Sequence, residues 1–342
     1  MQQGPLYQQL LASVTLLVMP YLLLRAAALV SLAFFADPPY KYYLTGSAAD
    51  VQTRTTPGFA LVGGGKDVDS VCRWFLQRSG GGDIVVLRAS GADGYNSYMT
   101  GLAPVDSVES LVVATPEAAR DPFVADRIRK AEALFIAGGD QWNYVRVWNH
   151  TPVSEAIQYL IDKGVPVGGT SAGLAVLGEY IYTAEKDTVT SAQALANPFD
   201  EHVTVGTDFL RIPALKGVVT DTHFHARDRM GRTLAFLSRM LEGGKLSEAR
   251  AIAIDERTAA LTEADGRIVV DGDGCVYFIR VRKPAEVLKH GVPLTFHGVA
   301  VYRVAKGGGF DLRAWTGNGG VAYTLDVENG AIRSTQPGGG IY

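Results

Sequence analysis

A serine flanked by glycines is the first feature of this sequence that could do chemistry. Residues 168–173 read GGTSAG and contain the pattern G-x-S-x-G, with Ser171 at its centre. An apolar run, VPVGG, precedes it, and a helix-forming run, AGLAVLG, follows, which is the context of a nucleophile elbow. We therefore predict that Ser171 is a nucleophile, although a packing turn without a catalytic role is the alternative. The N–H groups of Ala172, at the start of the helix, and of Gly139 are the expected donors to an oxyanion.

A serine nucleophile needs a base, and two histidines stand at the end of another apolar run. This run, GVVTDTHF, is followed by HARDRMGR, so that His223 and His225 are two positions apart. In a strand, such side chains point to the same face. Either histidine can then serve as the base, but a H-x-H pair can also hold a metal ion. A metal-dependent hydrolase that uses both histidines stays open as an alternative.

Three arginines follow these histidines within six residues. Arg227, Arg229 and Arg232 precede a predicted helix with an apolar face. Guanidinium groups bind carboxylates in a bidentate manner, so three of them beside an acyl-transfer centre are suited to an acidic substrate. A solvated helix start is the other interpretation, but cations are least favoured in the first turn of a helix.

The elements that position these residues are short apolar runs that alternate with segments of helical spacing. The apolar runs are FALVGG, DIVVLRAS, SLVVAT, ALFIAGG, VPVGGTS, GVVTDTHF and ARAIAID. This alternation predicts an α/β fold with a doubly wound, mostly parallel sheet, whose ligands lie beyond the carboxyl ends of the strands. After about residue 256 the pattern predicts antiparallel strands. We expect a main domain at 52–283, a β-rich C-terminal extension at 284–342, and a frayed end at STQPGGGIY.

Composition narrows the class of protein. The chain has 342 residues, 47% of them hydrophobic and 20% charged, which is enough for a sizeable core. A formal net charge of -3 gives no reason to expect nucleic-acid binding. Only Cys72 and Cys275 are present, so no disulfide framework and no cysteine zinc site is expected. A single bridge between the two is one option, and two separate thiols are the other.

The N-terminal residues differ from the rest of the chain. Residues 10–24 and 26–36 are almost entirely apolar and are separated by Arg25. If translation begins at Met19, residues 19–36 have the charged start, apolar middle and small residues of a signal peptide. We predict that residues 1–36 are a signal peptide or signal anchor, and that the protein is exported, either free or anchored to the membrane. A buried helix of the folded domain is the alternative.

Taken together, AGGDQ, GGTSAG and the D-x-H-F-x-x-R-x-R-x-G-R arrangement resemble the cyanophycinases and cyanophycinase-like exopeptidases of peptidase family S51. The resemblance covers roughly residues 55–265 and implies a fold similar to class I glutamine amidotransferases. It implies a serine peptidase acting next to aspartyl residues, without a cofactor or metal. In this resemblance Ser171 is the nucleophile and His223 the base. The carboxylates of the substrate are held by arginines at positions 227, 229 and 232.

The sequence departs from the family pattern at Thr222, where cyanophycinases carry glutamine, so the fit to a β-linked Asp-Arg dipeptide is open. For the acid of the triad we choose Asp187, with Glu185 and Glu179 as alternatives, because the chain order Ser, acid, His is common on such folds. The remaining substrate-binding candidates are Gln141, Asp221 and Thr222 itself. We thus expect an exopeptidase whose substrates are aspartyl peptides such as cyanophycin or its fragments. A homodimer is a further expectation. A non-catalytic binding module on the same fold is the further alternative.

Overall fold

The computed structural model describes residues 37–342, and Tyr40–Tyr342 form one compact unit. The predicted signal segment at 1–36, with its alternative start at Met19, lies outside the described residues. Among helices of residues 37–342, none combines the length and the apolar character that a membrane span requires.

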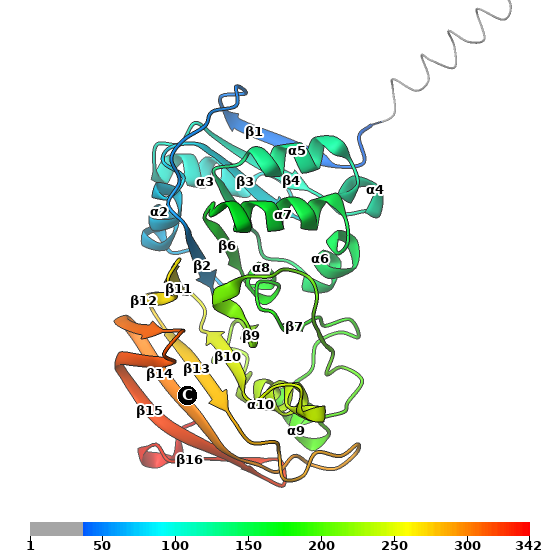
Figure 1. The fold of residues 1–342 in the computed structure, drawn as a ribbon, viewed down its shortest axis with the longest axis vertical. Helices are drawn as coiled ribbons and strands as arrows, with labels where there is room; N and C mark the ends of the chain where they lie inside the picture. The colour runs from blue at the N-terminus through cyan, green and yellow to red at the C-terminus, as the bar shows by residue number, and fades with distance from the viewer. Residues whose placement is uncertain (1–36) are drawn as a thin grey trace, which may run out of the picture. The chain divides into compact units, whose positions relative to one another are not determined.

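One large sheet of 14 strands runs through this unit (Figure 1). Its order is β1-β4-β3-β5-β6-β2-β11-β12-β14-β13-β10-β9, with β15 beside β14 and β16 beside β15. The strands of the N-terminal half are β1 (Lys41–Gly46), β2 (Gly58–Val62), β3 (Asp83–Arg88), β4 (Ser107–Val112), β5 (Ala133–Ile136), β6 (Val167–Thr170) and β9 (Val218–Asp221). Those of the C-terminal half are β10 (Ala249–Ile254), β11 (Thr258–Glu263), β12 (Arg267–Gly272), β13 (Cys275–Val281), β14 (Phe296–Asp311), β15 (Thr316–Glu328) and β16 (Ala331–Ser334). A separate small sheet pairs β7 (Ile181–Tyr182) with β8 (Val205–Gly206).

Helices cover both faces of the parallel strands β4, β3, β5, β6 and β2. These helices are α2 (Asp69–Gln77), α3 (Gly94–Leu102), α4 (Pro116–Ala119), α5 (Pro122–Lys130), α6 (Gln141–Trp148), α7 (Pro152–Lys163) and α8 (Ala172–Ala175). Two more helices lie elsewhere: α9 (Ser191–Ala196) packs on α10 (Met230–Met240), which lies against β9 and β10. Alternate residues of β3 show the two layers: Val85 and Leu87 pack with α5, α6 and α7, whereas Ile84 and Val86 pack with α2 and α3. The predicted doubly wound α/β fold is confirmed.

The C-terminal half continues the sheet with antiparallel strands, as predicted. β11 pairs with β2, and β12, β14 and β13 follow before β10, which lies parallel to β9. The apolar face of α10, including Leu234 and Phe236, packs in one cluster with residues of these strands. The boundaries expected at 52 and 284 stay predictions. The expected frayed end is wrong, because Ile341 and Tyr342 pack against that same cluster.

The two cysteines lie in different elements. Cys72 is buried in α2, and Cys275 is the partly buried first residue of β13. Both are free thiols, so the single bridge that the sequence left open is not formed.

Candidate active site

Ser171 occupies a strained turn between β6 and α8. Its φ of 53° and ψ of −120° are unusual for a residue with a side chain, and such strain persists only where the surroundings impose it. The glycines at either side allow the turn: a Cβ on Gly169 would lie 2.4 Å from the carbonyl oxygen of Gly173, and one on Gly173 would lie 2.0 Å from that of Ile136. The strand and the helix therefore approach closely and expose the serine, as a nucleophile elbow requires.

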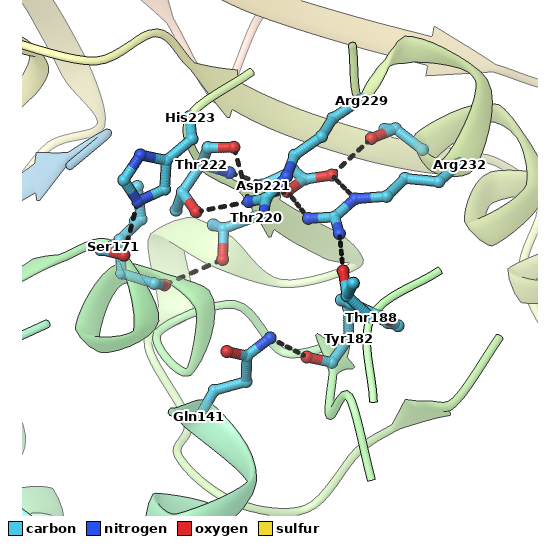
Figure 2. Close-up of polar contacts among 12 residues, drawn as sticks. Gln141, Ser171, Tyr182, Thr188, Thr220, Asp221, Thr222, His223, Arg229 and Arg232 are labelled. Carbon is cyan, nitrogen blue, oxygen red and sulfur yellow. Dashed lines mark hydrogen bonds and ion pairs between the residues drawn. The ribbon is translucent and has the colours of Figure 1, made fainter. Parts of the chain in front are cut away.

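A chain of two hydrogen bonds joins Ser171 to a histidine and a carboxylate. Ser171 Oγ lies 2.7 Å from Nε2 of His223 (Figure 2), and Nδ1 of His223 lies 2.6 Å from Oε1 of Glu256. The backbone N–H of His223 donates to the carbonyl oxygen of Gly63 at 2.8 Å. A Cβ on Gly64 would lie 2.5 Å from His223 Nε2, so the loop after β2 packs directly against the pair. Such a chain can activate a serine hydroxyl.

The carboxylate beside His223 corrects one prediction. Glu256, which follows β10, occupies the place that we had assigned to Asp187. Asp187 lies in an exposed turn, where its carboxylate accepts from the N–H of Thr188 at 2.7 Å. Of the alternatives, Glu185 is exposed and Glu179 accepts from the N–H of Gly217. Glu256 reaches His223 because β10 pairs with β9, so that the end of β10 lies beside the turn that carries His223. The backbone N–H of Phe224, in this turn, donates to the carbonyl oxygen of Ile254 at the end of β10.

The surroundings keep the histidine neutral and the carboxylate charged. Burial lowers the pKa of His223, and the charges of Arg227 and Arg229 lower it further, against the opposing effect of Glu256. The hydrogen bond from His223 lowers the pKa of Glu256. At neutral pH the imidazole can therefore accept the proton of Ser171, and the carboxylate can stabilise the imidazolium that results.

Ser171 and His223 open onto a pocket of about 590 Å³. The residues that line it come from five parts of the chain, namely Gly139, Asp140, Gln141 and Trp142; Ser171, Ala172 and Ala175; Tyr182, Ala184, Glu185, Asp187, Thr188, Val189 and Thr190; Thr220, Asp221, Thr222 and His223; and Arg227, Arg229 and Arg232. Both expected oxyanion donors are therefore in the pocket wall. Ala172 is the first residue of α8, where an N–H has no partner inside the helix. Gln141 also faces this pocket and donates to the carbonyl oxygen of Tyr182 at 3.3 Å (Figure 2).

The three arginines differ in what they contact. Arg232 is 3% exposed and binds Asp221 in a bidentate manner, with Nε 2.9 Å from Oδ2 and its second bond from Nη2 to Oδ1 (Figure 2). Burial opposes the charge of Asp221, but Arg232 outweighs it and holds the pKa of that carboxyl below its usual value. The two groups neutralise each other and form an internal ion pair in the pocket wall, and contact of either side chain with the substrate stays a prediction.

Arg229 and Arg227 keep free capacity for an anion. Arg229 donates from Nη1 to the carbonyl oxygen of Thr222 at 2.9 Å and to its Oγ1 at 3.1 Å, and it lies 3.6 Å from Asp221. Burial lowers its pKa to about 10, and Asp221 restores only part of the loss, so Arg229 is still charged at neutral pH. Arg227 is exposed at the mouth of the pocket. A substrate carboxylate would compensate both charges.

His225 lies apart from His223. The strand β9 ends at Asp221, and His223 adopts a φ of 46° in the turn that follows, so the expectation of two histidines on one strand face is wrong. The exposed ring of His225 stacks on Tyr342, with ring centroids 4.6 Å apart. Within residues 37–342, no group of three or more His, Cys, Asp or Glu side chains has a metal-binding arrangement. The two histidines therefore do not converge as the metal-dependent alternative requires.

The sequence contains a signal for Glu256, which the assumed chain order Ser, acid, His left out of consideration. Glu256 comes directly after the apolar run ARAIAID, and residues that follow parallel strands are where ligands and chemistry are found. Asp255, its neighbour, instead accepts from the N–H of His225 at 2.9 Å and from that of Cys275 at 3.0 Å. Its position after the end of a strand is therefore the sequence feature that points to Glu256.

Comparison with known proteins gives consistent matches. The model of peptidase family S51 matches residues 96–261, which include all members of the hydrogen-bond chain. A cyanophycinase of Trichormus variabilis is 29% identical over 212 residues, 60% of this chain and 66% of that protein, so the match spans just under two thirds of the relative. A cyanophycinase of Synechococcus elongatus is 29% identical over 252 residues, 70% of this chain and 73% of that protein. The crystal structure of a peptidase from an acI-B1 Actinobacterium shares the fold, with a TM-score of 0.51 and 16% identity over 76% of this chain and 98% of that one.

Proposed function

We propose that this chain belongs to peptidase family S51, whose model matches residues 96–261, and that it is a serine-type exopeptidase that hydrolyses peptide bonds beside aspartyl residues. The observation that carries the proposal is the hydrogen-bonded chain of Ser171, His223 and Glu256, of which the serine and the histidine line a pocket that also contains three arginines. A binding module on the same fold would not need the serine and the histidine within hydrogen-bond reach, and their 2.7 Å separation supports the enzyme.

The proposed reaction begins when Ser171 Oγ attacks the scissile carbonyl carbon and His223 Nε2 takes the hydroxyl proton. The carbonyl oxygen gains a negative charge, which the N–H groups of Gly139 and Ala172 stabilise. Glu256 stabilises the imidazolium of His223, which then gives its proton to the leaving amine as the C–N bond breaks. A water molecule, activated by the same histidine, hydrolyses the acyl-enzyme and regenerates the serine.

The proposed substrate is an aspartyl peptide whose free carboxylate meets Arg229, with Arg227 at the mouth of the pocket. Each charge-assisted hydrogen bond of this kind contributes about 1.5–3 kcal/mol. The same pocket also has acidic side chains in its wall, Asp140, Glu185 and Asp187, which suit a positively charged side chain of the substrate. A peptide with both charges, such as cyanophycin or a fragment of it, matches this arrangement of arginines and acidic side chains. The relatives described above are named cyanophycinases, which supports the same substrate.

The proposed nucleophile can be tested without knowledge of the substrate. A fluorophosphonate reacts with an activated serine, so intact-mass analysis should show one adduct on the parent protein, and peptide mapping should place it on Ser171. Ser171→Ala should abolish both the adduct and hydrolysis of aspartyl peptides while the protein stays folded. The matched control is Ser97→Ala, at an exposed serine of α3, which should react and hydrolyse as the parent does. An adduct on Ser171→Ala, or hydrolysis by that variant, would remove Ser171 from the mechanism.

We also propose that the mature protein is exported and lacks the first residues, on the evidence of the signal-peptide pattern at 1–36. Mass spectrometry of protein from its native host should find a first residue between Phe34 and Tyr40. An intact Met1 on a cytoplasmic protein would contradict this proposal.

A further inference from the structure

Tyr342 packs behind the turn that carries the arginines. Its ring stacks on His225 at 4.6 Å between centroids and meets the ring of Phe224 edge-on at 5.6 Å. Its hydroxyl group accepts from the N–H of Met230 at 2.9 Å and donates to Oδ1 of Asp228 at 2.8 Å. Burial raises the pKa of Tyr342, so the phenol stays neutral and can both donate and accept. One side chain thus bridges the turn and the start of α10.

This turn needs such support for three reasons. Asp228 has a φ of 47°, in the left-handed region, which is a strained conformation for a residue with a side chain. The first helix residue, Met230, has no help from its own N-cap, because Arg229 makes no side-chain capping bond. In addition, guanidinium groups beside a helix N-terminus are repelled by the helix dipole and by each other. The hydroxyl of Tyr342, which is 112 positions further along the chain, accepts the N–H of Met230 and so acts as the cap of this helix.

The C-terminal extension holds Tyr342 in this position. The hydroxyl of Tyr323, on β15, donates to the carbonyl oxygen of Ile341 at 2.9 Å. The side-chain amide of Gln336 donates to the carbonyl oxygen of Gly340 at 2.7 Å. The segment that precedes Tyr342 is therefore fixed on the extension, which transmits this support from the β-rich half to the turn.

We propose that Tyr342 is a positioning residue that sets the affinity for the acidic substrate by holding Arg227 and Arg229 in place. This inference rests on the proposed function, and it extends that function to a residue outside the pocket. The effect falls on substrate binding rather than on the chemical step, because the backbone N–H and the ring of His223 are held by Gly63 and Glu256, which lie outside the turn. Loss of the tyrosine contacts leaves those two bonds intact.

The experiment compares Tyr342→Phe, which keeps the ring, with Tyr342→Ala, which loses it, using an aspartyl peptide as substrate. The matched control is Tyr302→Phe, since Tyr302 also accepts a backbone N–H bond, from Gly320 at 3.0 Å, within the extension. Tyr342→Phe should raise KM roughly threefold to tenfold, the equivalent of one lost hydrogen bond, with kcat nearly unchanged. Tyr342→Ala should raise KM further, and the control should change neither constant. An unchanged KM in Tyr342→Phe, or an equal rise in the control, would overturn the proposal.

Hydrogen exchange separates this proposal from the proposed function. In the ligand-free protein, the amides of residues 227–231 should exchange faster in Tyr342→Phe than in the parent, whereas Tyr302→Phe should leave them protected. If the parent cleaves no aspartyl peptide, the proposed function fails, and exchange alone then decides whether Tyr342 holds the turn. Unchanged exchange in Tyr342→Phe would refute the positioning role.

Discussion

Replacing Glu256 by glutamine tests the assignment of the carboxylate that supports His223. Glutamine has nearly the same shape, so the change removes a charge and leaves the packing intact. Glu256 accepts from Nδ1 of His223 at 2.6 Å, which holds Nε2 unprotonated and facing Ser171. A glutamine amide can instead donate to Nδ1, and the imidazole then carries its proton on Nε2, where it cannot act as a base.

The expected loss follows from the geometry. Loss of the carboxylate in a Ser-His-Asp triad lowers kcat about 10⁴-fold. Because the side chain of Glu256 is 33% exposed, water can stabilise part of the imidazolium charge, and we expect a loss nearer to about 10³-fold, or about 4 kcal/mol of transition-state stabilisation. Thermal unfolding should change little, since the carboxylate is partly solvated in the folded protein.

The assay is the initial rate of hydrolysis of an aspartyl peptide by the parent, Glu256→Gln and Asp187→Asn. Asp187→Asn is the matched control, because it removes an exposed carboxylate from the wall of the same pocket. We expect this control to keep kcat, although KM can rise if the substrate carries a positive charge. A Glu256→Gln enzyme with parental kcat, or an Asp187→Asn enzyme that loses as much, would refute the reasoning.

Three further predictions concern the arginines, the pH profile and Thr222. Arg229→Ala should raise KM for aspartyl peptides at least roughly tenfold without loss of stability. Arg232→Ala should remove the bidentate partner of the buried Asp221, which then keeps only the more distant Arg229 as a counter-charge, and should lower the free energy of unfolding by about 3–5 kcal/mol in urea titration. Because burial lowers the pKa of His223 from 6.5, the acid limb of kcat/KM should lie below pH 6.5 and shift upward in Arg229→Ala; a limb above that value would contradict the account. Thr222→Gln introduces the residue that the resemblance to cyanophycinases implies at this position. It should raise turnover of cyanophycin relative to other aspartyl peptides, and an unchanged ratio would show that Thr222 does not set specificity.

Local features of the site could be predicted from the sequence because their causes are local. The elbow at Ser171 needs only a strand, two glycines and a helix in succession, and all of these can be recognised in residues 165–178. The parallel sheet follows likewise from alternating runs, since each strand is apolar on both faces. The sequence also predicts that His223 lies at the edge of the sheet where ligands bind, because it follows the end of a strand by two positions.

Features that depend on long-range partners could not be predicted in this way. The sequence does not show that Arg232 forms an ion pair with Asp221, because the pairing depends on how the turn after β9 folds. The assumed order Ser, acid, His pointed to an acid between Ser171 and His223, whereas the sheet places the end of β10, and with it Glu256, beside His223. Tyr342 stands after a run of glycines that is typical of a frayed end, and only the extension brings it to the turn. In each case a contact between distant parts of the chain decides the role.

The most direct test of the central claim is product analysis after incubation of the parent protein and Ser171→Ala with α-linked and β-linked Asp-Xaa peptides and with cyanophycin. Mass spectrometry identifies the bond that is cut, and a matching set of neutral peptides measures the contribution of the substrate carboxylate. The account predicts cleavage beside aspartyl residues by the parent, little cleavage of neutral peptides, and none by Ser171→Ala. Equal cleavage of neutral peptides, or cleavage by Ser171→Ala, would contradict it.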